Sequence, residues 1–260
     1  MDTDALFSVA GKAALVTGGS RGIGLMIAEG LLSSGARVYI SARKAAACDD
    51  AAEHLSQFGA CVSIPADLST KEGSDALASD VARREPKLDI LVNNAGATWG
   101  APLLEYPDDA WDKVLATNVK AVFHLTTALV PQLRAAASAD DPARVVNIGS
   151  VDGMRVPATE NYAYAASKAA VHMLTRQLAD RLARDHITVN AIAPGPFRSK
   201  MMAFVLDADG GEEMVASSVP LRRIGRPEDA AGATLFLTSR AGSYLTGAVI
   251  PVDGGISTHG

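Results

Sequence analysis

The stretch Thr17-Gly18-Gly19-Ser20-Arg21-Gly22-Ile23-Gly24 decides the fold, because it follows a short apolar run and opens onto the helical pattern Leu25 to Leu32. Glycine lets the backbone approach a phosphate closely, and a helix N-terminus offers unpaired N–H groups and positive potential. A tight strand-to-helix turn without a ligand could use the same glycines. The place of the turn in the first strand–helix unit predicts that Gly18, Ser20, Arg21, Gly22, Ile23 and Gly24 hold a dinucleotide diphosphate.

The rest of the chain alternates between short strand-like apolar runs and longer helix-like stretches. This alternation predicts a doubly wound α/β fold, with one domain over residues 1–260 and a seven-stranded, mainly parallel sheet between two layers of helices. Long helices are expected at Asp108 to Leu133 and Tyr162 to Asp185, and an irregular substrate loop at residues 194–226. The expected strands are Lys12 to Thr17, Arg37 to Ala42, Cys61 to Pro65, Leu88 to Val92, Arg144 to Ile148, Ile187 to Ile192 and Ala248 to Val252.

Composition and charge exclude several functional classes. The 260 residues are 48% hydrophobic and 20% charged, with a formal net charge of -5 and interleaved acidic and basic side chains. No basic face favours nucleic acid as a partner. No apolar run approaches the roughly 18 to 20 residues of a membrane-spanning helix, and Met1 to Ala10 lacks a signal-peptide pattern. We therefore expect a cytoplasmic protein without a membrane or nucleic-acid partner.

The cysteines and histidines do not form a metal-binding pattern. Cys48 and Cys61 are the two cysteines, and their number and spacing fit neither a disulfide framework nor a zinc site, so we expect free thiols. The five histidines lie far apart, without an HxxxH or HExxH motif, and no metal is expected. They are His54, His124, His172, His186 and His259.

The residues after the second expected strand indicate which dinucleotide binds. This strand ends in Ser41-Ala42-Arg43-Lys44, about 20 residues past the glycines, where an NAD-binding unit carries an acid for the ribose 2'-hydroxyl. No acid stands there. Arg43, with help from Lys44 and Arg21, can instead pair with a 2'-phosphate, and this predicts NADP(H) as the cofactor. The alternative is that these are ordinary solvated basic residues.

A tyrosine and a lysine at helical spacing are the main catalytic candidates. Tyr164 and Lys168 are four residues apart, so both project from one face of a helix. A nearby ammonium is expected to lower the pKa of the phenol from its ordinary value near 10, which would make Tyr164 a usable proton donor and acceptor. Tyr162 is the competing candidate, but the residue four positions after it is Ala166.

Two polar residues elsewhere in the chain strengthen this assignment. Ser150 falls at the carboxyl end of an expected buried strand, where open α/β sheets place ligands, although a serine there is more often a turn residue. Asn118 lies inside an expected long helix, where asparagine is a mediocre helix former and therefore needs a polar partner or a function. A satisfied buried amide is the alternative interpretation of Asn118.

Taken together, these residues resemble the short-chain dehydrogenase/reductase family in its single-domain form. The resemblance covers Lys12 to Gly255. It rests on the Thr17 to Gly24 turn, Asp67-Leu68, Asn93-Asn94-Ala95-Gly96, Asn118, Ser150, Tyr164 with Lys168, Asn190 through Pro194-Gly195, and Asp253-Gly254-Gly255.

The resemblance implies roles for these residues. Tyr164 would transfer a proton to the substrate oxygen, Ser150 would orient that oxygen, and Lys168 would tune Tyr164 and bind the nicotinamide ribose. Asn118 would support a water-mediated proton relay. The resemblance also implies a homotetramer, and apolar residues on several sides of the two long helices agree with an oligomer. Further cofactor contacts are implied for Asp67, Leu68, Asn94, Ala95, Gly96, Pro194, Gly195, Phe197 and Ser199.

Two departures from the family pattern concern the nicotinamide and the active-site loop. Ser199 stands where the family commonly has threonine, and Phe197 stands where a small aliphatic residue is frequent. The interval from Ser150 to Tyr164 is one residue longer than usual, and we expect a loop at Pro157 to Glu160 to absorb the difference.

The substrate is less well defined by the sequence, because this fold and these catalytic residues serve many ketones. Local strings such as Thr98-Trp99-Gly100 and Gly149-Ser150-Val151 resemble 3-oxoacyl reductases, particularly the branch associated with rhamnolipid synthesis. That resemblance implies reduction of a 3-oxoacyl thioester. The candidate substrate linings are Thr98-Trp99-Gly100, Asp152 to Val156 and Phe197 to Met214. The apolar residues of the last segment fit a lid over an acyl chain, and they fit a dimer contact or packing within the lid equally well. The alternatives are a reductase of a sugar, steroid or xenobiotic carbonyl, and a non-catalytic dinucleotide-sensing regulator.

Overall fold

Within residues 2–258, which the computed structural model describes, a seven-stranded parallel sheet runs in the order β3-β2-β1-β4-β5-β6-β7. The order reverses beside β1, which pairs with both β2 and β4. This reversal defines a doubly wound sheet, and ligands bind at the carboxyl ends of its strands. The strands are β1 (Ala13–Thr17), β2 (Arg37–Ser41), β3 (Cys61–Ser63), β4 (Ile90–Asn93), β5 (Ala143–Ile148), β6 (Ile187–Pro194) and β7 (Val249–Val252).

Each expected strand forms close to its expected position, which confirms the α/β fold class. The largest shifts are two residues each, at β3, which ends at Ser63 instead of Pro65, at β4, which begins at Ile90 instead of Leu88, and at β6, which continues to Pro194 instead of Ile192. The N–H of Leu88 donates to the carbonyl of Gln132, so this residue is bonded outside the sheet ladder.

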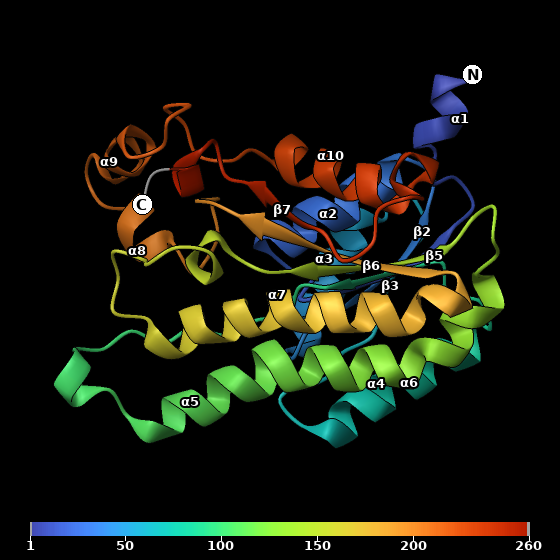
Figure 1. The fold of residues 1–260 in the computed structure, drawn as a ribbon, viewed down its shortest axis with the longest axis horizontal. Helices are drawn as coiled ribbons and strands as arrows, with labels where there is room; N and C mark the ends of the chain where they lie inside the picture. Colours follow the sequence, from blue (N-terminus) through green and yellow to red (C-terminus); the bar gives the residue numbers. More distant parts are fainter. Residues whose placement is uncertain (1, 259–260) are drawn as a thin grey trace.

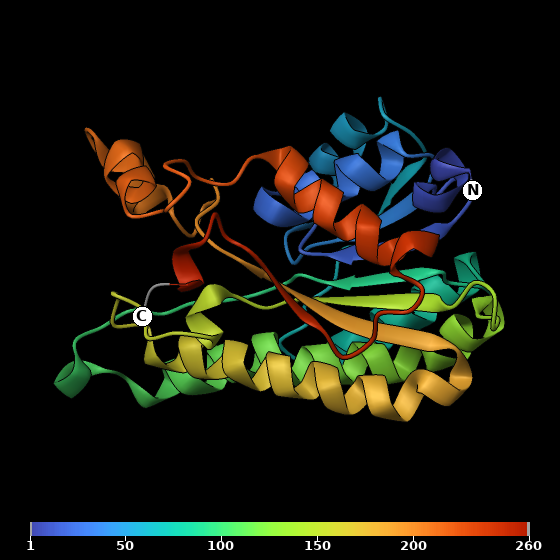
Figure 2. The same cartoon turned by 45° about the horizontal axis from the view of Figure 1, so that its top comes forward.

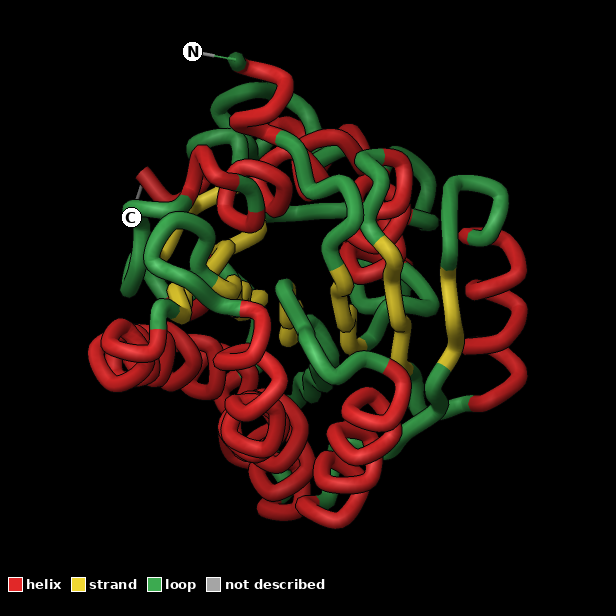
Figure 3. Tube along the Cα trace, turned by 90° about the vertical axis from the view of Figure 1, so that its right-hand side faces the viewer, coloured by secondary structure: helices red, strands yellow, loops and turns green. Residues whose placement is uncertain are grey.

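Two layers of helices cover the sheet (Figures 1 and 3). Side chains alternate along β1, so Ala14 and Val16 belong to one core cluster and Ala13 and Leu15 to the other. The first layer contains α2 (Gly22–Ser33), α3 (Ala45–Leu55) and α10 (Pro227–Thr238). The second contains α4 (Lys71–Arg84), α5 (Asp108–Leu115), α6 (Ala121–Ala136) and α7 (Tyr162–Leu182).

The helix predicted at Asp108 to Leu133 is longer and is interrupted. A π-helical turn, η2 (Ala116–Lys120), separates α5 from α6, and the helical stretch continues to Ala136. In residues 2–258 this stretch, Asp108–Ala136, is the one helix long and apolar enough by length and composition to cross a membrane. It packs against α4 and α7 within the second layer (Figure 2). Packing within a folded layer is typical of a core helix.

The region predicted to be irregular contains two short helices, α8 (Ala203–Leu206) and α9 (Gly211–Ser217). They follow β6 and lie at the end of the molecule to which its carboxyl end leads (Figures 1 and 2). Leu206 is 4% exposed, whereas Phe204 is 73% exposed and Met214 61%. The segment therefore has its own small core and leaves other apolar side chains uncovered.

The remaining described elements are α1 (Thr3–Phe7) and the short turns η1 (Leu103–Glu105), η3 (Val151–Gly153), η4 (Ala183–Asp185), η5 (Arg240–Gly242) and η6 (Ile256–Thr258).

Candidate active site

The glycine turn is packed so tightly that side chains in place of its glycines would not fit. Gly18 and Gly22 have φ angles of +64° and +54°, in the left-handed region that favours glycine. A Cβ atom at Gly24 would lie 2.3 Å from both the Gly18 carbonyl oxygen and Nδ2 of Asn94. Helix α2 begins at Gly22, and its first N–H groups therefore point toward this turn. This geometry leaves the backbone N–H groups open to a ligand, and the binding of a diphosphate by Gly18 to Gly24 stays a prediction.

Asn94 and Ala95 hold the glycine turn from the neighbouring strand. Nδ2 of Asn94 donates to the carbonyls of Thr17 (2.8 Å) and Gly18 (3.1 Å). The N–H groups of Asn94 and Ala95 both donate to Oγ1 of Thr17, at 2.9 and 3.0 Å. The amide of Asn94 is thus engaged in positioning the turn. Thr17 is a functional residue whose positioning role sequence reasoning missed.

Three exposed basic side chains lie at this end of the site. Arg21 precedes α2, and Arg43 and Lys44 follow β2; all three are exposed, and no salt bridge in residues 2–258 includes any of them. Asp67 accepts from the N–H (3.0 Å) and hydroxyl of Ser69, which lowers its pKa, and the charge of Arg43 acts in the same direction. These cations are available to a phosphate.

Lys168 and Tyr164 lie on the first turns of α7, beside the carboxyl end of β5. Nζ of Lys168 donates to the carbonyl of Ile148 at 2.8 Å and lies 5.5 Å from the centre of the Tyr164 ring. Burial lowers the pKa of Lys168 to about 8. Ser150 is 7% exposed and follows β5. The structure thus brings Ser150, Tyr164 and Lys168 together.

The pKa of Tyr164 differs from the sequence-based expectation. Burial raises it to about 12, and a hydrogen-bonding contact with Ser150 offsets part of this rise, while Asp152 adds to it. The ammonium of Lys168 lies over the ring and bonds a carbonyl, and it does not produce the expected decrease. Tyr164 therefore keeps its proton at neutral pH, which is the state that a proton donor requires.

Tyr162 has a different environment. Its hydroxyl donates to Oε1 of Glu160 at 2.9 Å, and its ring meets Tyr106 edge to face at 5.3 Å. The hydrogen bond to Glu160 raises the pKa of this phenol. Glu160 also accepts the N–H of Leu103 at 3.2 Å, so the loop with the extra residue is tied to the segment that carries Trp99.

Asn118 lies in the π-helical turn and is 1% exposed. Its Oδ1 accepts the N–H of Ala97 at 2.7 Å, and its Nδ2 donates to the carbonyl of Ala97 and to Oγ of Ser167, both at 2.9 Å. Ser167 in turn donates to the carbonyl of Tyr164 at 2.7 Å. The expected polar partners exist, and π-helical turns are common at functional sites.

Gly96 connects Asn118 with the catalytic lysine. A Cβ atom there would lie 3.4 Å from Oδ1 of Asn118 and 3.8 Å from Nζ of Lys168. The backbone of this predicted cofactor residue therefore passes between the two polar side chains.

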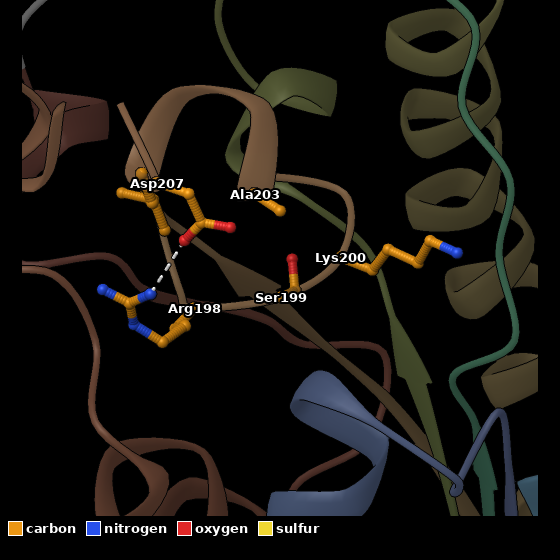
Figure 4. A pocket seen from close by; sticks show the side chains of 6 residues that line it. Arg198, Ser199, Lys200, Ala203 and Asp207 are labelled. Carbon is orange, nitrogen blue, oxygen red and sulfur yellow. Dashed lines mark hydrogen bonds and ion pairs between the residues drawn. The ribbon is translucent and has the colours of Figure 1, made fainter. Parts of the chain in front are cut away.

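The segment after β6 approaches the glycine turn. A Cβ atom at Gly22 would lie 3.2 Å from Cβ of Ser199. Ser199 lines a cavity of about 280 Å³ together with Arg198, Lys200 and Asp207, and its hydroxyl points into this space (Figure 4). Arg198 pairs with Asp207 at 3.1 Å and with Glu212, which joins both short helices of the lid.

The side chain of Phe197 is buried in the core. It is 3% exposed and belongs to the first core cluster. A Cβ atom at Gly225 would lie 2.3 Å from its Cζ, so the ring fills the space that this glycine leaves. The large residue is therefore accommodated in the core, and only the backbone of Phe197 remains available to a cofactor. Pro194 and Gly195 precede it, and Gly195 lies against Asp253.

Sequence reasoning missed two groups of buried polar residues behind the site. Nδ2 of Asn93 donates to Thr126 (3.0 Å) and Asn147 (2.9 Å), and Asn147 donates to Thr175 (2.9 Å), which links the sheet to α6 and α7. Burial lowers the pKa of His172 to about 4. A signal for the asparagines was present, because Asn147 interrupts an apolar strand and Asn93 ends another.

Cys48 and Cys61 are free thiols, as expected. No group of three or more His, Cys, Asp or Glu side chains in the described residues could hold a metal ion, and His259 lies outside them. The absence of a metal cofactor stays a prediction.

This fold and site define an oxidoreductase of the dinucleotide-binding α/β class. A family model described as Enoyl-(Acyl carrier protein) reductase matches residues 18–257. The chain belongs to the short-chain dehydrogenase/reductase family, as its motifs indicated.

The similarity extends over nearly the whole chain. The chain is 52% identical over 249 residues to the rhamnolipids biosynthesis 3-oxoacyl-(acyl-carrier-protein) reductase of Pseudomonas aeruginosa, which covers 96% of this chain and 97% of that protein. It is 36% identical over 252 residues to 5-keto-D-gluconate 5-reductase of Escherichia coli, covering 96% and 97%. The Pseudomonas aeruginosa RhlG/NADP active-site complex has a TM-score of 0.95 at 51% identity, covering 97% of this chain and 99% of that chain.

Proposed function

We propose that this oxidoreductase uses NADPH to reduce the ketone of a 3-oxoacyl thioester to the 3-hydroxyacyl form. The observation that carries the ketone reduction is the group formed by Ser150, Tyr164 and Lys168 at the carboxyl end of β5. The thioester assignment draws on the 3-oxoacyl reductase that is 52% identical to this chain.

The bound cofactor supplies the hydride, and this chain supplies binding, orientation and the proton. Ser150 donates a hydrogen bond to the ketone oxygen, and Tyr164 delivers its hydroxyl proton to that oxygen as it gains negative charge. The ammonium of Lys168 stabilises the phenolate that remains. Asn118 anchors the π-helical turn to α7 through Ser167, and a water relay that reprotonates Tyr164 would pass beside it.

The fit of the cofactor rests on the tight turn at Gly18 to Gly24 and on the unpaired cations Arg21, Arg43 and Lys44. The turn has no room for side chains where a diphosphate would approach. Arg43 presents a planar guanidinium to the ribose 2'-phosphate that distinguishes NADPH from NADH. Asp67 and Leu68 would flank the adenine of the bound cofactor.

Changing Arg43 to Asp is expected to remove the preference for NADPH. Loss of a charge-assisted contact and a new repulsion should raise the Kd for NADPH about tenfold or more and leave that for NADH much less affected. Fluorescence titration of both cofactors measures this. Arg181→Asp is the matched control, because its side chain is 86% exposed at the far end of α7. Equal affinity of the unaltered enzyme for the two cofactors contradicts the assignment.

The exposed apolar side chains of the lid favour a substrate with an apolar acyl chain. Met201, Phe204 and Met214 are 36%, 73% and 61% exposed on one segment beside the site. Each methylene that they cover contributes about 0.8 kcal/mol at most, so catalytic efficiency should rise by up to a few-fold per carbon until the lid is filled. Replacing Met201 and Met202 with serine should flatten this trend and spare short ketones.

A substrate panel followed by NADPH absorbance tests the proposal. It contains 3-oxoacyl thioesters of several chain lengths, the matching enoyl thioesters, and a keto sugar acid, since the relatives include a 5-ketogluconate reductase. We expect turnover of the 3-oxoacyl series with a chain-length trend. Efficient reduction of only the enoyl thioesters or only the sugar acid rejects the thioester ketone as the substrate.

We also propose a cytoplasmic homotetramer. Phe123 on α6 and Met173 on α7 are 44% and 53% exposed, and they leave apolar surface outside the core for a second copy. A monomer by light scattering at micromolar concentration would reject the assembly.

A further inference from the structure

A second cavity lies beside the turn that follows Ser150. It has a volume of about 300 Å³ and is lined by Arg155, Arg222, Ile256 and residues 217–220. The red segment before the C-terminus lies between the orange α8–α9 segment and the yellow-green loop after β5 in two views (Figures 1 and 2). None of the residues that line it is assigned to the cofactor, and Arg155 alone among them belongs to one of the candidate substrate linings, Asp152 to Val156.

Arg155 brings an unused guanidinium to this cavity. Its Nε is buried, and it donates to no acceptor in the part of the chain that the structure describes. Its N–H donates to the carbonyl of Val151 at 3.0 Å, which fixes it on the turn that begins at Ser150. The charge of Arg155 acts on Asp253, but the carboxylate of Asp253 accepts the N–H groups of Gly255 and Ser257, both at 2.9 Å.

Arg222 supplies the second guanidinium. Its φ of +55° is one of two left-handed values among the non-glycine residues described, and such a conformation persists where the surroundings determine it. Nη1 donates to the carbonyl of Ser217 at 2.6 Å, which leaves its other N–H groups available. No salt bridge within residues 2–258 includes Arg155 or Arg222.

The wall that carries Arg222 is fixed against the C-terminal segment. The N–H of Leu221 donates to the carbonyl of Gly254 at 3.1 Å. A Cβ atom at Gly254 would lie 2.5 Å from Cγ1 of Val219. Because these backbones are in close contact, the cavity is formed before a ligand arrives.

The chemistry of the cavity fits a phosphate attached to an extended arm. Two guanidinium groups without carboxylate partners bind a phosphate well, and Val219, Pro220 and Ile256 offer an apolar surface beside them. The hydroxyls of Ser217 and Ser218 donate to the carbonyls of Met214 and Val215, both at 2.7 Å, so the arginines provide the donors for an anion.

We propose that Arg155 and Arg222 bind the phosphate of the phosphopantetheine arm that carries a 3-oxoacyl thioester. This inference rests on the proposed function. In the proposed function the ketone lies at Ser150, and Arg155 is five residues further along the chain, so one short segment carries a residue for the ketone and a residue for the phosphate. The phosphopantetheine phosphate is common to coenzyme A and acyl carrier proteins, and the site therefore accepts either.

The test compares the same 3-oxoacyl group on pantetheine, on phosphopantetheine and on coenzyme A. For the unaltered enzyme, the phosphate should lower KM about tenfold relative to pantetheine, and coenzyme A should add little beyond phosphopantetheine. In the double variant Arg155→Gln/Arg222→Gln, the ratio of the two KM values should fall to near one. Arg181→Gln is the matched control and should keep the full ratio.

Direct binding gives a measurement that does not require turnover. Calorimetry should detect binding of phosphopantetheine but not pantetheine, and the double variant should lose it. Arg155→Lys, which keeps the charge, should retain part of it. If the double variant does not fold, Arg155→Gln alone carries both measurements, because its Nε has no hydrogen-bond partner within residues 2–258 and the carboxylate of Asp253 keeps its bonds to Gly255 and Ser257.

The outcomes separate this inference from the proposed function. Equal KM values and equal binding for the two arms overturn the phosphate site while leaving ketone reduction intact. If KM falls with coenzyme A but not with phosphopantetheine, the arginines bind the nucleotide of coenzyme A, and this result also overturns the proposal. Binding of phosphopantetheine without turnover of any 3-oxoacyl thioester supports the phosphate site and rejects the proposed ketone substrate.

Discussion

Replacing Tyr164 with phenylalanine is expected to lower kcat by about 10² to 10⁴-fold, the usual contribution of a positioned general acid. The variant removes only the hydroxyl whose pKa burial raises to about 12 and which contacts Ser150. The Kd for NADPH should change little, because the glycine turn and Arg43 remain. Steady-state NADPH absorbance measures kcat, and fluorescence titration measures the Kd.

Tyr162→Phe is the control for this prediction. Its hydroxyl bonds Glu160 at 2.9 Å and its ring packs against Tyr106, so it stabilises the loop before α7 without facing Ser150. We expect kcat close to that of the unaltered enzyme. The opposite pair of results, with Tyr162 essential and Tyr164 dispensable, would show that the wrong tyrosine has been assigned.

The sequence predicted the sheet well because buried parallel strands are short continuous apolar runs. The apolar runs also located the glycine turn, and the spacing of Tyr164 and Lys168 indicated the catalytic group. Asn118 shows both the reach and the limit of this reasoning. Its poor fit to a helix predicted polar partners, which exist in Ala97 and Ser167, but nothing in the sequence indicated a π-helical turn.

Features that depend on burial were not predictable from the sequence. The expectation for Tyr164 considered the nearby charge of Lys168, whereas the folded chain surrounds the phenol with enough protein for desolvation to dominate. His172 illustrates the same limit, since burial first, then Lys168 and Arg176, keep it neutral. A Cβ atom at Gly149 would lie 2.1 Å from its Nε2, so this ring supports the strand end before Ser150.

The lid was predicted as irregular because its periodicity is short. A helix as short as α8 (Ala203–Leu206) gives no repeat that could be recognised in a sequence. The start of the lid segment is also held by a contact distant in sequence, the bridge between Phe197 and Gly225. The side chains proposed to recognise a substrate therefore lie in the part of the chain where sequence patterns are weakest.

Replacing Gly24 with alanine should abolish tight NADPH binding while leaving Tyr164 in place. The new methyl group would lie 2.3 Å from the Gly18 carbonyl oxygen and 2.3 Å from Nδ2 of Asn94. Neither can move freely, because Asn94 bonds the carbonyls of Thr17 and Gly18. The turn must shift, which raises the Kd for NADPH about tenfold or more. Overpacking should also lower the free energy of unfolding by about 1 to 3 kcal/mol.

Gly232→Ala on α10 is the matched control, because a Cβ atom there has nothing within 4 Å and this glycine is exposed. Alanine is the better helix former by about 0.5 to 1 kcal/mol, so this variant should unfold at a slightly higher temperature and bind NADPH normally. Calorimetric unfolding and fluorescence titration of both variants separate the two effects. A Gly24→Ala enzyme that binds NADPH as tightly as the Gly232→Ala enzyme would mean that the cofactor's diphosphate does not depend on this turn.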